Sequence, residues 1–163
     1  MQLSDICALP VGDIADKDCA LFLWVTYPNL REAFAVIDAW GFEYKTVAFT
    51  WVKRNKKSSS FFVGMGHWTR ANAELCLLAT KGKPKRISKS VRQIIDTPIE
   101  RHSKKPDVAR ERIVELLGDI PRIELFAREK TENWDVFGNE VESDIILNRQ
   151  EEKFVSIESG FTL

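Results

Sequence analysis

The residues best suited to chemistry lie together in the segment GMGHWTRANAELCLLATKG. After a glycine-rich start, His67 and Trp68 are followed by Arg70, Asn72 and Glu74, and then by a short apolar run. An aromatic ring can stack on a nucleic-acid base, and the polar side chains can hydrogen-bond base edges or phosphates. In the alternative interpretation, Trp68 packs in the core and Glu74 neutralises a nearby lysine.

The context of this segment excludes several other kinds of site. Its glycines precede a predicted strand, whereas the glycines of a dinucleotide fingerprint follow a strand and open a helix. No Gly-Lys-Ser/Thr completes a Walker loop, and no G-x-S-x-G marks a hydrolase nucleophile. Two histidines, His67 and His102, and three cysteines without C-x-x-C spacing form no metal-binding pattern. We therefore predict no metal.

The elements that position the segment alternate along the chain. Continuous apolar or β-branched runs predict strands at residues 20–25, 46–52, 75–80 and 123–127, with a short edge strand at residues 91–95. Helical spacing predicts one helix ending at Gly41 and another from Pro106 to Gly118. This alternation predicts an α/β fold with a mostly parallel sheet. Ligands of such sheets bind beyond the carboxyl ends of strands, so we expect a site among the loops after residues 25, 52, 80 and 127.

Composition indicates a globular domain whose charge is unevenly distributed. The 163 residues carry no formal net charge, but residues 53–112 hold 16 Lys/Arg against 5 Asp/Glu, and residues 129–163 hold 3 against 9. The basic middle either contacts phosphates or forms a solvated surface. No apolar run approaches the roughly 20 residues that span a membrane, and no signal peptide is evident. Three unpaired thiols favour a cytoplasmic location.

Linked motifs place the chain in a known family. The runs GHWTRANAELCLLATKGKP, RHSKKPD, IELFAR and NWDVFGNEV resemble, in order and spacing, the MT-A70 family of S-adenosylmethionine-dependent N6-adenine methyltransferases. ALFLWV and AWGFEYKTVAFTWVK also fit the family pattern. The chain is most similar to the short bacterial and phage DNA-modifying members. We therefore expect an MT-A70-like domain at residues 1–148 and a tail at residues 149–163.

The resemblance implies a Rossmann-like methyltransferase fold with permuted motif order, in which the cofactor-binding strand comes late. It implies S-adenosylmethionine as cofactor, with Lys105 approaching it and Arg128 near its ribose or carboxylate. Asn139 and Glu140 are implied as further cofactor contacts. These residue types suit the ligand, because ribose hydroxyls bind carboxamides or carboxylates and the methionine carboxylate binds a cation.

The resemblance also implies a substrate and the residues that bind it. His67, Trp68 and Glu74 are expected to line the adenine side, where the glycines let the backbone approach the base. The implied reaction is methyl transfer to N6 of adenine in DNA, with RNA as the less favoured substrate. The implied partner is DNA. The chain could also form a homo- or hetero-oligomer, and no membrane association is expected.

One family motif is absent from the sequence. The catalytic signature is Asp-Pro-Pro-Trp or a close variant, and none of the six prolines is adjacent to another. In that signature, the acid and a proline carbonyl accept the two N–H hydrogens of the adenine amine, and the aromatic ring stacks on the flipped base. We expect the chain to begin downstream of the catalytic strand and to be inactive or nearly so alone. The alternative is a non-catalytic nucleic-acid-binding or partner subunit derived from a methyltransferase.

Overall fold

The computed structural model describes residues 1–147, 161 and 162. Its helices and 3-10 turn are α1 (Leu3–Cys7), α2 (Val11–Ile14), η1 (Tyr27–Asn29), α3 (Leu30–Ala39) and α4 (Asp107–Leu117). Its strands are β1 (Cys19–Val25), β2 (Glu43–Arg54), β3 (Ala73–Lys81), β4 (Ile94–Pro98), β5 (Ile123–Leu125), β6 (Asp135–Phe137) and β7 (Phe161–Thr162). Most of the predicted elements are present, although β2 is longer than expected and β4 begins three residues later. Most of the predicted tail lies outside the described residues.

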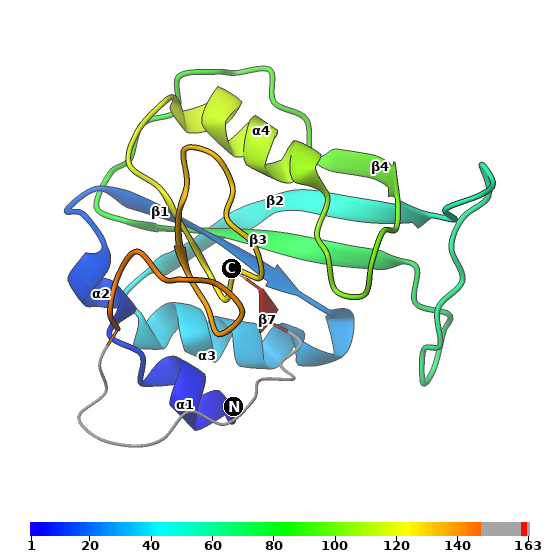
Figure 1. The fold of residues 1–163 in the computed structure, drawn as a ribbon, viewed down its shortest axis with the longest axis horizontal. Helices are drawn as coiled ribbons and strands as arrows, with labels where there is room; N and C mark the ends of the chain where they lie inside the picture. Colours follow the sequence, from blue (N-terminus) through cyan, green and yellow to red (C-terminus); the bar gives the residue numbers. More distant parts are fainter. Residues whose placement is uncertain (148–160, 163) are drawn as a thin grey trace.

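Five strands form the central sheet in the order β4-β2-β3-β1-β7 (Figure 1). β3 pairs antiparallel with both β1 and β2, β7 pairs antiparallel with β1, and only β2 and β4 pair in parallel. The prediction of a mostly parallel sheet is therefore wrong. The physical reason is the connection between β2 and β3, which holds no helix and returns the chain beside the strand that it leaves.

The late strand also differs from the sequence prediction. β5 contains three residues and pairs in parallel with β6 in a separate two-stranded sheet. Phe126 follows with a φ of 59°, in the left-handed region, so the extended conformation ends there instead of continuing to Ala127. The expected position of a cofactor strand within the main sheet is not observed.

Strand direction determines which loops gather at one edge of the central sheet. β1, β2 and β4 run the same way, and β3 begins where they end. Val25 lies opposite Leu75 and Arg54 opposite Pro98, so the loops after β1 and β2 meet at this edge, as predicted. Thr80 pairs with Ala20 at the other end of the ladder, so the expectation that the loop after β3 contributes to the site is wrong.

Helices cover both faces of the sheet (Figure 1). α3 buries Ala33, Val36 and Ile37 at helical spacing in a core that α1 and the sheet complete. On the other face, α4 buries Ala109 in a second core, which contains Trp24, Phe49, Trp51, Cys76 and Ile95. Gly41 and Gly118 follow α3 and α4 with positive φ, as predicted for helix ends. Within the described residues, no helix is long and apolar enough to cross a membrane.

Candidate functional site

An aromatic and ionic cluster lies where β1, β2 and β4 end. Ladder pairing sets Trp51 opposite Glu74 and Trp24 opposite Cys76. Cross-strand partners share one face of a sheet, and so do residues two apart on one strand. Lys53 follows Trp51 by two residues and therefore joins this face. The register of three strands thus brings two indoles, a carboxylate and an amine together on the side that α4 covers.

Glu74 is held between two lysines. Its Oε1 accepts a hydrogen bond from Lys53 Nζ at 2.6 Å, and its Oε2 accepts one from Lys105 Nζ at 2.6 Å. The side chains of Glu74, Lys53 and Lys105 are 9%, 18% and 13% exposed. We call these three residues the ion-pair cluster. It carries one more positive than negative charge, so it favours an anionic ligand.

The lysines decide the charge state of Glu74. Burial acts to raise the pKa of this carboxyl, but Lys105 and then Lys53 outweigh burial and hold the pKa below its usual value. Burial raises the pKa of the neighbouring Cys76 thiol, and Lys105 opposes this only in part. Glu74 is therefore a carboxylate at neutral pH, whereas Cys76 remains a protonated core thiol that cannot serve as a nucleophile.

The two indoles form the walls of the ion-pair cluster. Trp24 and Trp51 contact each other edge to face, with ring centroids 6.3 Å apart. Lys105 Nζ lies 5.9 Å from the Trp24 ring centroid, and Lys53 Nζ lies 5.0 Å from that of Trp51. Cations at such distances are attracted by the negative faces of aromatic rings. The indoles therefore hold both ammonium groups in place without neutralising them.

A second group of predicted residues lies on the segments that follow β5 and β6. Arg128 Nη1 donates a hydrogen bond to the His102 carbonyl at 3.1 Å, and its Nε lies 3.4 Å from Glu140 Oε1. Arg101 also pairs with Glu129 at 2.9 Å. These contacts attach the segment of Arg128 to the loop that leads to Lys105. Arg128 and Glu140 are thus brought together, with Asn139 beside them in the same exposed turn.

The structure separates His67 and Trp68 from Glu74. Trp68 is 95% exposed, and its only ring contact among the described residues is with His67, at 6.0 Å between centroids. The alternative interpretation of Trp68 as a core residue is therefore wrong. The matching interpretation of Glu74, as the partner of a lysine, is confirmed.

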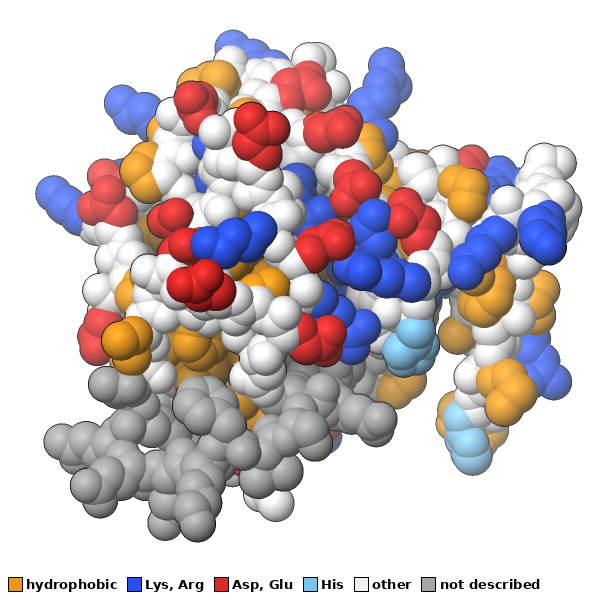
Figure 2. All heavy atoms as spheres, in the orientation of Figure 1, with side chains coloured by type: hydrophobic (Ala, Val, Ile, Leu, Met, Phe, Trp, Pro, Cys, Tyr) orange, Lys and Arg blue, Asp and Glu red, His pale blue; other side chains and the backbone are white. Residues whose placement is uncertain are grey.

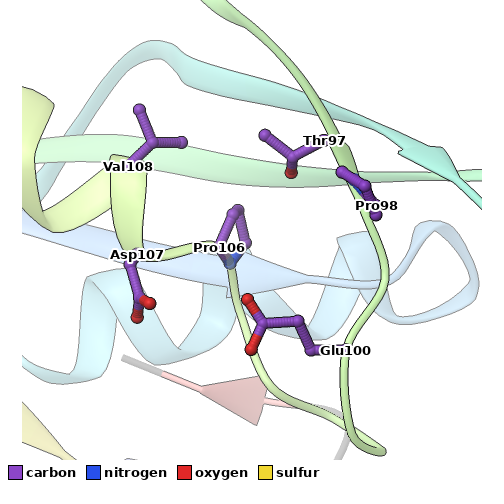
Figure 3. Close-up of a pocket in the computed structure, with 6 residues that line it drawn as sticks. All are labelled: Thr97, Pro98, Glu100, Pro106, Asp107 and Val108. Atoms are coloured by element: carbon purple, nitrogen blue, oxygen red, sulfur yellow. The ribbon is translucent and has the colours of Figure 1, made fainter. Parts of the chain in front are cut away.

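Beside Lys105, the surface is hollowed between the end of β4 and the start of α4. The hollow has a volume of about 440 Å³ and is lined by Thr97, Pro98, Glu100, Pro106, Asp107 and Val108 (Figure 3). In Figure 3 the side chains of Glu100 and Asp107 lie at its lower rim. The Thr97 hydroxyl is buried without a hydrogen-bond partner in the described structure. Among the described residues, no three histidine, cysteine or acidic side chains gather as a metal site.

Comparison with known proteins identifies the family. The family model described as MT-A70 matches residues 1–140. The chain belongs to the MT-A70 family. It is 34% identical over 143 residues to the Type II methyltransferase M.MunI of Mycoplasma sp, covering 86% of this chain and 58% of that protein. It is 26% identical over 155 residues to the N(6)-adenosine-methyltransferase MT-A70-like protein of Arabidopsis thaliana, covering 86% of this chain and 22% of that protein.

A third relative extends this pattern. The putative N(6)-adenosine-methyltransferase MT-A70-like protein of Medicago truncatula is 28% identical over 149 residues, which cover 82% of this chain and 24% of that protein. The chain therefore spans little more than half of the bacterial relative and about a quarter of the plant relatives. What the comparisons establish is an MT-A70 methyltransferase domain, shared across proteins of very different length.

Three residues at this site of the MT-A70 domain, one in the ion-pair cluster and two beside it, were not expected from the sequence. Lys53, Trp24 and Trp51 surround Glu74 and Lys105, although none of them was predicted as a site residue. Trp51 and Lys53 could have been found from their spacing, because residues two apart on a strand lie on the same face of the sheet. Their strand ends beside the glycine-rich segment. The pairing of Trp24 with this group depends on β3 lying between β1 and β2, which local sequence does not reveal.

Gly138 allows its own turn to pack closely against the backbone beside Arg128, and a substitution at residue 138 tests this role. A Cβ at residue 138 would overlap the backbone carbonyl of Ala127, whose N–H donates to the Phe137 carbonyl at 3.0 Å. We expect Gly138→Ala to lower the free energy of unfolding by about 2 kcal/mol, because backbone must move to accept the methyl group. Gly12→Ala is the matched control, since its Cβ would meet only the Trp40 carbonyl at 3.4 Å. Urea unfolding of both variants measures the difference, and equal stabilities would contradict the expected effect.

Proposed function

We propose that the chain forms the cofactor- and substrate-binding part of an N6-adenine methyltransferase that uses S-adenosylmethionine and acts on DNA. The observation that carries this proposal is the mostly buried contact of Lys105 with Glu74 at the edge where three strands end. Two residues implied separately, one for the cofactor and one for adenine, are there in direct contact. Family membership and the methyltransferase names of the relatives support the reaction class.

The donors and acceptors near Lys105 fit the proposed cofactor. S-adenosylmethionine presents a carboxylate and ribose hydroxyls, and its sulfonium supplies the methyl group. Lys105 belongs to a cluster with surplus positive charge, which suits the carboxylate. Arg128 offers a planar guanidinium that is still 42% exposed, and Glu140 offers a carboxylate that is 64% exposed. Asn139 adds a carboxamide in the same turn, so both ends of the ligand have matching partners.

We further propose that these 163 residues bind but do not transfer the methyl group at enzyme rates. The adenine amine is a poor nucleophile until an acid and a carbonyl accept its two hydrogens. Glu74 already accepts from two lysines, and no Asp-Pro-Pro-aromatic sequence is present. Glu74 therefore serves to hold Lys105 and Lys53 in position, and it leaves the proton-accepting role to a motif that this sequence does not contain.

The preference for DNA rests on the pattern of similarity. The chain is more similar to the Type II methyltransferase, at 34% identity, than to the plant N(6)-adenosine-methyltransferases, at 26% and 28%. We therefore propose the DNA-modifying type of the family, which the sequence motifs resemble, over the RNA-modifying type. The names of the plant relatives support N6 of adenine as the atom that is methylated.

Calorimetric titration with S-adenosylmethionine tests the proposal. We expect Arg128→Ala to weaken binding about tenfold, because a charge-assisted hydrogen bond to the ligand is lost. Arg86→Ala is the control, since Arg86 is exposed in the loop that leaves β3 at the other end of the ladder from the ion-pair cluster, and this variant should bind as the wild type does. Failure of the wild-type chain to bind the cofactor would overturn the proposed function. It would favour the second candidate, a non-catalytic nucleic-acid-binding or partner subunit. The lack of an Asp-Pro-Pro-aromatic motif in this sequence also favours that candidate.

A further inference from the structure

The connection between β2 and β3, residues 55–72, stands away from the body of the molecule (Figures 1 and 2). We call this segment the arm. It leaves the sheet at the edge where the ion-pair cluster lies, directly after Lys53 and Arg54. Lys53 N–H donates to the Asn72 carbonyl at 3.0 Å, and Phe62 N–H donates to the Lys53 carbonyl at 2.8 Å. The base of the arm is therefore attached to the residue that holds Glu74.

The arm has a defined shape. Gly64 N–H donates to the Ala71 carbonyl at 2.8 Å, so its two sides are joined beyond the base. A Cβ on Gly66 would overlap the Thr69 carbonyl, so the tip closes in a way that only glycine allows. Arg54 lies over the ring of Phe61 at 3.9 Å, which fixes the arm against β2. These contacts hold the backbone of the arm in one conformation, and this conformation sets the positions of its exposed side chains.

The surface of the arm is apolar and basic without acidic residues. Met65 and Trp68 are each 95% exposed, and Val63 and Phe61 are 63% and 49% exposed. Lys56, Lys57 and Arg70 are exposed beside them, and residues 55–72 contain no aspartate or glutamate. Several other cations of the basic middle are neutralised by acidic partners, as in the pairs Arg54–Asp96, Lys104–Glu100 and Arg110–Glu124. Among the described residues, Lys56, Lys57 and Arg70 form no such ion pair, so their charges are available to a bound partner.

We propose that the arm grips nucleic acid beside the methylation site, with Trp68 stacked on a base and Lys56, Lys57 and Arg70 on the adjacent phosphates. This inference rests on the proposed function and adds the element that holds the strand. An exposed aromatic flanked by cations is the chemistry by which proteins hold unpaired bases, and an extruded adenine leaves such unpaired positions beside it. An acidic protein partner is the alternative occupant, and the experiment separates the two.

A second basic loop provides a matched comparison. Residues 82–93 contain five cations, Lys83, Lys85, Arg86, Lys89 and Arg92. This loop leaves β3 at Lys81, which pairs with Cys19 at the far end of the ladder from the ion-pair cluster. It holds more cations than the arm, which has Lys56, Lys57 and Arg70, but it lacks the position of the arm and its exposed tryptophan. Removing two lysines from each loop therefore separates a local role of the arm from general attraction to a polyanion.

Fluorescence anisotropy with a labelled adenine-containing oligonucleotide, measured over a range of salt concentrations, tests the inference. We expect Trp68→Ala to weaken binding about tenfold with an unchanged salt slope, and Trp68→Phe to restore most of the affinity. Lys56→Ala/Lys57→Ala should weaken binding and reduce the salt slope by roughly 1–2. Lys85→Ala/Lys89→Ala should have a smaller effect on affinity. Equal effects of the two double variants, or no effect of Trp68→Ala, would overturn the inference.

Intrinsic fluorescence provides an independent measurement on the same chain. Trp24, Trp40 and Trp51 are buried, and Trp134 lies against Arg122, so Trp68 is the tryptophan most open to solvent. We expect an unlabelled oligonucleotide to reduce acrylamide quenching in the wild type but not in Trp68→Phe. Unchanged quenching on bound oligonucleotide would show that Trp68 does not contact the nucleic acid, and it would overturn the inference. Cofactor binding by the same samples reports on the proposed function separately, because it depends on Lys105 and Arg128.

Discussion

Replacing Glu74 with alanine should lower the free energy of unfolding by about 3 kcal/mol, one of the largest effects expected of any single substitution here. The reason is that Lys53 and Lys105 would then remain as two positive charges in a mostly buried site, each having lost its carboxylate. Chemical unfolding in urea measures this, with a decrease in melting temperature of about 10 °C as a second observable. Part of this loss would be recovered only if both lysine side chains moved to reach water.

A matched variant distinguishes burial from ion pairing as the cause. Asp96 pairs with Arg54 at 2.6 Å, but its side chain is 48% exposed. Solvent screens such pairs, so Asp96→Ala should lower the free energy of unfolding much less than Glu74→Ala does. A loss in Asp96→Ala as large as that in Glu74→Ala would contradict the assignment of the effect to the buried cluster.

The same carboxylate should make stability depend on pH. The pKa of Glu74 is lower in the folded chain than in the unfolded chain. Its contribution is therefore fully present above the unfolded pKa and is lost as the pH falls through the folded pKa. The wild type should lose stability toward acid more steeply than Glu74→Gln, which cannot titrate at this position. Parallel pH profiles for the two proteins would show that other carboxyl groups account for the acid sensitivity.

Lys105→Ala should weaken S-adenosylmethionine binding by at least about 30-fold, because truncating one member of a buried, hydrogen-bonded charge pair costs 2 kcal/mol or more. Two losses combine in this variant. The ligand carboxylate loses its proposed partner, and Glu74 keeps only Lys53, which removes the surplus of positive charge in the cluster. Calorimetry measures the effect, and melting temperature without ligand reports whether the variant still folds.

The neighbouring lysine provides a close control. Lys104 has a similar exposed fraction, 18% against 13%, but its Nζ pairs with Glu100 and Asp107, whose carboxylates are more than half exposed. We expect Lys104→Ala to change cofactor affinity less than about threefold, since solvent replaces these pairs. If the two alanine variants bound the cofactor equally, Lys105 would be a structural residue, and the proposed cofactor contacts would be reduced to Arg128, Asn139 and Glu140.

Local sequence was sufficient for most of the elements. The run at residues 20–25 is apolar throughout, as a doubly covered strand requires, and it forms β1 between two helical layers. Gly41 and Gly118 marked helix ends because they adopt a conformation that costs other residues energy. Strand direction was not predictable in this way. An apolar run looks the same in either direction, and the turn of the chain between β2 and β3 depends on how the arm folds back.

For the candidate site too, some features were predictable from the sequence and others were not. Lys105, Arg128, Asn139, Glu140 and Glu74 were named from motifs, because the residue types that bind carboxylates, hydroxyls and bases are limited and lie in a recognisable order. The sequence by itself determined this inventory, the family and the positions of most strands and helices. Only the tertiary structure decided that Glu74 accepts hydrogen bonds from both Lys105 and Lys53, beside Trp24 and Trp51. It also decided that Trp68 lies exposed on the arm, away from this cluster. The physical reason is that these contacts join strands distant in sequence, and their register follows from burying two cores at once.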